Sequence, residues 1–140
     1  MKQMTTKIPK FKIDDRMPVL KQIAYRFMEE KPFKGIKIGA CLHITNETMG
    51  LIYTLRSGGA KVYLCASNPL TTQDDVADAM RFEGIEVFGH RGNTIEQYNT
   101  ALKQMAQIGF DYVIDDGADL TVEIMKGGTG NMMPRAGLEE

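Results

Sequence analysis

The sequence predicts an α/β domain, a doubly wound, Rossmann-like parallel sheet of about four strands with helices on both faces. Four short apolar segments rich in branched residues alternate with longer segments of helical periodicity. This alternation is typical of parallel strands joined by crossover helices. The chain has 140 residues, of which 43% are hydrophobic and 25% are charged, and these values fit a single domain, 1–140, with an ordinary core.

The beginning of the chain predicts an N-terminal arm followed by a helix. Residues 1–16 show no clear period and include Pro9. In residues 17–30 the apolar side chains fall at helical spacing, and Pro18 stands near the first turn, where its missing N–H costs little. The segment KPFKG, at 31–35, ends this helix.

The following segments predict the sheet and its crossover helices. IKIGACLHI, the first of them, is a continuous apolar run, which is typical of a buried parallel strand. Pairs of polar residues, Thr72 with Asp75 and Thr94 with Gln97, predict capping boxes at two helix starts, and GGTG at 127–130 indicates a loop. The predicted strands are 36–44, 60–67, 85–90 and 110–117, and the predicted helices between them are 46–59, 71–84 and 93–109.

The composition argues against several classes of protein. No apolar run approaches the roughly 20 residues that cross a bilayer, and the N-terminus has no apolar core of the signal-peptide kind, so we expect a cytoplasmic protein with no membrane partner. The first forty residues are basic, as a nucleic-acid-binding face would be, but a net charge of −1 favours a solvated helix and no nucleic-acid partner. We expect Cys41 and Cys65, in predicted strands, to be buried and unlinked.

The common cofactor and metal motifs are missing from the sequence. It has no GxGxxG dinucleotide fingerprint, no P-loop, no HExxH and no CxxC, and we expect no metal site. In a doubly wound sheet, ligands bind outside the carboxyl ends of the strands. The candidate residues are therefore the polar ones at these ends. They are His43 to Glu47, Ser67 and Asn68, His90 and Arg91, and Asp115 and Asp116.

Each candidate has a structural alternative to a chemical role. His43 could carry a proton or only hydrogen-bond at a strand end. Asp115 and Asp116 point to different sides of a strand tip, so that one enters a site while the other caps a helix or holds the loop, or both are caps. The polar turn at 67–75 could hold an anion or only cap a helix. Glu47 is favourable in the first turn of a helix without any ligand.

Four colinear segments carry a resemblance to a known family. They are KPFKGIKIGACLHITNET, SNPLTTQDDVADAM, GHRGNTIEQYNTAL and DYVIDDGADLT. In this order they resemble the KPLKGxxIxxCLHMTxET, SNPLSTQDDVAAAL, KGETxEEYxxxL and xxILDDGGDLT segments of the S-adenosylhomocysteine hydrolases. The resemblance covers about residues 17–126, and the last four residues, 137–140, are similar to the start of the family's EETTTG signature.

The resemblance implies the first part of a substrate-binding domain for S-adenosylhomocysteine or adenosine. In this family a bound NAD oxidises the ribose 3′-hydroxyl, the C4′ proton becomes acidic, homocysteine leaves from C5′, water adds, and the ketone is reduced again. The resemblance implies catalytic acid/base roles for His43 and Asp116. It implies substrate contacts for Thr45 and Glu47 at the adenine, for Glu140 at the ribose hydroxyls, and for Asn68 and Thr71 in the loop after the second strand.

The chain departs from the family in what it lacks. The family's catalytic lysine and aspartate beyond EETTTG, its GxGxxG domain for NAD and its C-terminal tail have no counterpart in these residues. We therefore expect a fragment or truncated relative that is inactive alone and holds no NAD, whereas complete family enzymes are homo-oligomers with NAD. The alternative is a non-enzymatic nucleoside-binding or protein-interaction module, because a fold by itself does not specify a function.

Overall fold

The computed structural model describes residues 13–127 and 133–140, and within these ranges it contains five helices and five strands. The helices are α1 (Pro18–Glu30), α2 (Asn46–Ser57), α3 (Asp74–Phe82), α4 (Ile95–Ala106) and α5 (Asp119–Lys126). The strands are β1 (Lys37–Leu42), β2 (Lys61–Ala66), β3 (Glu86–Phe88), β4 (Tyr112–Asp115) and β5 (Ala136–Glu139). No helix in the described ranges is long and apolar enough to cross a membrane.

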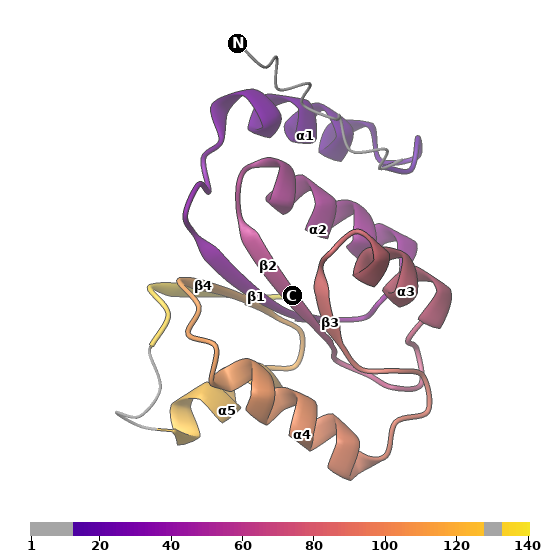
Figure 1. The fold of residues 1–140 in the computed structure, drawn as a ribbon, viewed down its shortest axis with the longest axis vertical. Coiled ribbons are helices and arrows are strands. Elements are labelled where there is room, and N and C mark those ends of the chain that lie inside the picture. Colours follow the sequence, from indigo (N-terminus) through magenta and orange to yellow (C-terminus); the bar gives the residue numbers. More distant parts are fainter. Residues whose placement is uncertain (1–12, 128–132) are drawn as a thin grey trace.

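All five strands are parallel and lie in the order β3-β2-β1-β4-β5. Figure 1 shows α1, α2 and α3 on one side of the sheet and α4 and α5 on the other. The predicted doubly wound α/β fold is confirmed. The chain moves outward from β1 to β3, and α4 then carries it back to β4, on the other side of β1. The strand order therefore reverses between β1 and β4, and this reversal is where such folds bind ligands.

The sheet has one strand more than the sequence predicts. The four residues of β5 pair with β4 and are all exposed, and backbone hydrogen bonds from Arg135 to Asp111 and from Glu140 to Asp115 continue the pairing. An edge strand with both faces in solvent needs no apolar pattern, so the pattern of AGLE gives no sign of it. The predicted loop at 127–130 lies largely outside the described residues, as do residues 1–12 of the predicted arm.

One of the two predicted capping boxes is present. At the start of α4, Thr94 and Gln97 exchange both hydrogen bonds of the box. The box at Thr72 and Asp75 is wrong, because α3 begins only at Asp74 and no side chain caps it. The hydroxyl of Thr72 is fully buried and donates instead to the backbone oxygen of Asn68, 3.0 Å away. Thr72 therefore holds the turn before the helix.

Buried side chains alternate between the two faces of the central strand, β1. Ile38, Ala40 and Leu42 belong to the core under α2 and α3, whereas Cys41 belongs to the core under α4 and α5. Cys41 lies beside Cys65 of β2 in the sheet register, and both cysteines are buried and free, as predicted. A hydrogen bond with Cys65 and burial raise the pKa of the Cys41 thiol, so this thiol stays protonated.

Candidate functional site

A histidine and an aspartate meet at the carboxyl ends of the two strands between which the strand order reverses. His43 directly follows β1 and Asp116 directly follows β4, and the backbone N–H of Asp116 donates to the carbonyl oxygen of Cys41. The Nε2 atom of His43 lies 3.0 Å from Oδ2 of Asp116, and the two side chains are 44% and 29% exposed. The pair can therefore share a proton and is still open to a ligand.

The loop after β2 supplies a second partner to the same histidine. Oγ1 of Thr71 lies 2.6 Å from Nδ1 of His43, so both ring nitrogens have partners. Asn68 shapes this loop, because its side-chain oxygen accepts the backbone N–H of Leu70 at 2.9 Å. The hydroxyl of Thr48 donates to the backbone oxygen of His43 and fixes the strand end from the other side. The histidine is therefore held through its backbone and both sides of its ring.

The two adjacent aspartates, Asp115 and Asp116, have different partners. Asp115 is 1% exposed, and its Oδ2 atom accepts hydrogen bonds of 2.8 Å from the backbone N–H and the hydroxyl of Thr121, in the first turn of α5. Asp116 faces His43. The geometry therefore matches the alternative in which one aspartate, Asp115, caps a helix and the other, Asp116, lies at the candidate site.

The remaining predicted substrate contacts also lie at the carboxyl edge of the sheet. Thr45 is the N-cap of α2 and accepts the backbone N–H of Thr48, and the exposed Glu47 follows in the first turn. The exposed Glu140 follows β5, and its backbone N–H donates to the carbonyl oxygen of Asp115. All seven predicted site residues therefore share one edge of the sheet, while their roles stay predictions.

The site also depends on residues that sequence reasoning missed. The carboxylate of Glu139 accepts the backbone N–H of Gly117 at 2.6 Å and so fixes the turn that presents Asp116. Nothing in the local sequence indicates this contact, since it requires β5 to lie beside β4. Thr48 could have been found, because the string Thr45-Asn46-Glu47-Thr48 places a hydroxyl at the third position after an N-cap threonine.

The turn after Asp116 contains a strained residue, Ala118, whose replacement by glycine should stabilise the fold. Ala118 has φ +62°, a left-handed conformation that costs an L-residue roughly 1–2 kcal/mol. We expect Ala118→Gly to raise the free energy of unfolding by about 1 kcal/mol in urea denaturation, because glycine has no Cβ penalty there. Ala79→Gly, at an exposed position inside α3, should lower it by about the same amount. A loss of stability in both variants would contradict this explanation.

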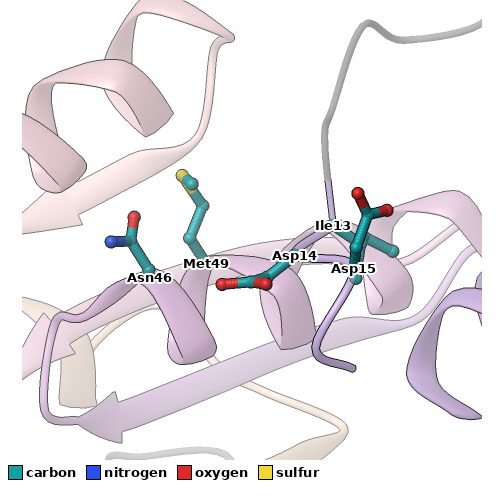
Figure 2. A pocket seen from close by; sticks show the side chains of 5 residues that line it. All are labelled: Ile13, Asp14, Asp15, Asn46 and Met49. Carbon is teal, nitrogen blue, oxygen red and sulfur yellow. The ribbon is translucent and has the colours of Figure 1, made fainter. Parts of the chain in front are cut away.

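A nearby hollow is lined by two acidic residues. Figure 2 shows Asp14 and Asp15, from the segment before α1, with Asn46 and Met49, from the start of α2, around this hollow. Arg16 hydrogen-bonds the Asp14 carboxylate and lowers its pKa to about 2. The Nζ atom of Lys21 lies 2.9 Å from Oδ1 of Asp15. Each carboxylate therefore already has a cation, and no cluster in the described ranges has the side chains to hold a metal ion.

Comparison with known proteins identifies the family. A family model for S-adenosyl-L-homocysteine hydrolase matches residues 9–137. The chain belongs to this family. The resemblance carried by the four sequence segments is thereby confirmed, and the edge of the sheet that bears His43 and Asp116 lies inside the matched region.

The curated relatives are much longer than this chain. An adenosylhomocysteinase of Aquifex aeolicus is 55% identical over 111 residues, which are 79% of this chain and 27% of that protein. An adenosylhomocysteinase of Aeropyrum pernix is 52% identical over 106 residues, which are 76% of this chain and 26% of that protein. An S-inosyl-L-homocysteine hydrolase of Methanocaldococcus jannaschii is 50% identical over 104 residues, which are 74% and 25% of the two chains. The chain thus spans about a quarter of the length of these relatives.

A solved structure, that of L-tryptophan dehydrogenase from Nostoc punctiforme, is similar to 86% of this chain with a TM-score of 0.48. The similarity covers 32% of the dehydrogenase, and the sequence identity is 12%.

Proposed function

We propose that this chain forms one side of an adenosylhomocysteinase active site and binds the nucleoside part of S-adenosyl-L-homocysteine. The complete enzyme would hydrolyse this thioether reversibly to adenosine and L-homocysteine. The observation that carries the proposal is the His43–Asp116 contact of 3.0 Å at the strand-order reversal, in a chain of this family. Ligands of doubly wound sheets bind at this position.

The pair can supply the proton that a departing thiolate needs. When the C5′–S bond breaks with its electron pair on sulfur, a proton of the charged His43 ring can pass to the sulfur, and the neutral ring keeps its Nε2–H group toward Asp116. The Asp116 carboxylate, 3.0 Å away, stabilises the imidazolium before this transfer. In the reverse direction the neutral ring takes the proton back from the thiol. Positioned proton transfer of this kind contributes roughly 10²-fold or more to a rate.

The family's oxidation and reduction of the ribose are supplied by NAD, and the residues of this chain do not fit that cofactor. A dinucleotide turn between a strand and a helix needs glycines so that the backbone approaches the pyrophosphate. The turn between β1 and α2 carries His43, Ile44 and Thr45 instead, and the sequence contains no GxGxxG. We therefore propose that NAD is held by protein outside these 140 residues and that this chain does not turn over substrate alone.

In this proposal, Glu47 would determine whether the site prefers adenine or hypoxanthine. If Glu47 contacts the base, its carboxylate accepts a hydrogen bond from the 6-amino group of adenine, whereas the 6-oxo group of hypoxanthine offers no donor. Both nucleosides need testing because the relatives include an S-inosyl-L-homocysteine hydrolase. We propose adenosine as the preferred nucleoside.

A titration with adenosine and inosine, followed by amide chemical shifts in NMR, tests the proposal. Adenosine should shift the amides of 43–47 and 115–117 first, and it should bind several-fold more tightly than inosine, although weakly, because only one side of the site is present. Glu47→Gln should narrow this ratio, because an amide can donate to the 6-oxo group. Glu29→Gln, on the exposed side of α1, is the matched control and should leave the ratio unchanged.

Two outcomes of this titration would contradict the proposal. The first is a set of shifts confined to residues 127–133, which would favour an interaction module over a nucleoside site. The second is the absence of any shift at 43–47 and 115–117 with either nucleoside. Equal binding of adenosine and inosine would contradict only the proposed role of Glu47.

A further inference from the structure

The hydroxyl of Thr71 lies within hydrogen-bond distance of two groups, and it can donate its hydrogen to either of them. Its Oγ1 atom is 2.6 Å from Nδ1 of His43 and 3.2 Å from the backbone oxygen of Asn68. A hydroxyl has one hydrogen to donate and two lone pairs to accept with. It can therefore donate to one of these two groups at a time while it accepts from a donor.

This arrangement satisfies the histidine in both of its protonation states. When the ring is neutral, the Thr71 hydroxyl donates to Nδ1, and the Nε2–H group donates to Asp116. When the ring is charged, Nδ1–H donates to the Thr71 oxygen, and the hydroxyl hydrogen turns to the carbonyl of Asn68. In neither state does a ring nitrogen lose its partner, so that gaining or losing a proton leaves the ring in place.

The surrounding loop allows the hydroxyl to turn at little cost. The Asn68 carbonyl oxygen also accepts the hydroxyl of Thr72, at 3.0 Å, and the backbone N–H of Thr71, at 3.3 Å. It therefore stays hydrogen-bonded when the Thr71 hydroxyl faces the histidine. Thr72 is fully buried, and its burial anchors the loop that carries Thr71.

We infer that Thr71 is a positioning residue for His43, which holds the ring with Nε2 toward Asp116 through a change of protonation state. This inference rests on the proposed function, in which His43 gains and loses a proton. It differs from the direct substrate contact that the family resemblance implies for Thr71. The threonine methyl group restricts χ1, so that the hydroxyl is held at the ring more firmly than a serine hydroxyl would be.

The nitrogen shifts of the imidazole ring test this role without any nucleoside. Long-range ¹H–¹⁵N correlation at pH about 8.5, where an ordinary histidine is neutral, gives the ratio of the Nε2–H to the Nδ1–H tautomer. Thr71→Val leaves Nδ1 without its partner in either tautomer and lets the ring turn away from Asp116, so this ratio at His43 should fall about fivefold, the factor that the lost hydrogen bond from Nε2–H to Asp116 contributes. Thr71→Ser should restore the ratio to within about twofold of the native value, because it keeps the donor.

Two internal controls make the result specific. Thr100→Val removes a hydroxyl that donates to the backbone oxygen of Glu96 on α4, and it should leave the His43 signals unchanged. His90, the other histidine of the chain, should keep its own ratio in every variant. Thr71→Ala is a second variant without the hydroxyl and replaces Thr71→Val if the valine variant does not fold.

The inference would be overturned by an unchanged ratio in a folded variant that lacks the hydroxyl, or by a serine variant that behaves like the valine variant. Its failure is distinct from a failure of the proposed function. A chain that shows the tautomer change but binds no nucleoside would contradict the proposed function alone. A chain that binds adenosine with the same tautomer ratio in all variants would contradict only the role of Thr71.

Discussion

Gly39→Ala is expected to lower the free energy of unfolding by about 3 kcal/mol, at the upper end of the cost of overpacking a core. A Cβ atom on Gly39 would lie 2.4 Å from two carbons of the Phe110 ring, which is 1% exposed. Gly39 is in the middle of β1, where Tyr63 and Val113 flank it in the sheet register. Because the ring is buried and β1 is paired with a strand on each side, relief of this contact would shift core elements.

The matched control is Gly137→Ala, on the edge strand β5. Among the residues that the structure describes, a Cβ atom there would meet the backbone oxygen of Val113 at 3.7 Å, an ordinary contact, and the change in stability should stay within about 0.5 kcal/mol. Chemical denaturation of both variants measures the difference. Equal stability of the two variants would show that the contact between Gly39 and Phe110 does not limit the packing of β1.

Asp115→Ala is expected to lower the free energy of unfolding by about 2 kcal/mol, whereas Asp116→Ala should change it by less than about 0.5 kcal/mol. The Asp115 carboxylate accepts two hydrogen bonds from Thr121 at the start of α5. Its removal leaves that N–H without its cap and opens a buried space. Ala118, the N-cap of this short helix, makes no side-chain capping bond that would compensate.

The opposite pattern should appear in nucleoside binding. Asp116 is partly exposed and contacts His43, so its loss should weaken the adenosine-dependent shifts at 43–47 while the fold remains intact. Hydrogen exchange of the α5 amides separates the two variants further, since exchange should accelerate in Asp115→Ala and stay native in Asp116→Ala. An Asp116 variant that is as unstable as the Asp115 variant would contradict this division of roles.

Much of the fold and of the candidate site could be predicted from local patterns in the sequence. Apolar runs and helical periodicity predicted β1 to β4 and the helices around them, because burial on a strand or a helix face repeats at a short, fixed spacing. The parallel arrangement then placed His43, Asn68 and Asp116 at one edge, since parallel strands all end on the same side. The family followed from four strings of adjacent residues.

The tertiary structure alone decided which polar groups become partners. Asp115 and Asp116 are equivalent by composition, and only the positions of α5 and β1 make one a buried cap and the other a partner of His43. Likewise, β5 exists because β4 offers it a backbone edge, and the Thr71 hydroxyl reaches His43 because β2 lies beside β1. A hydrogen bond depends on distance and direction between groups far apart in the chain, whereas a hydrophobic pattern records only which side of its own element a residue faces.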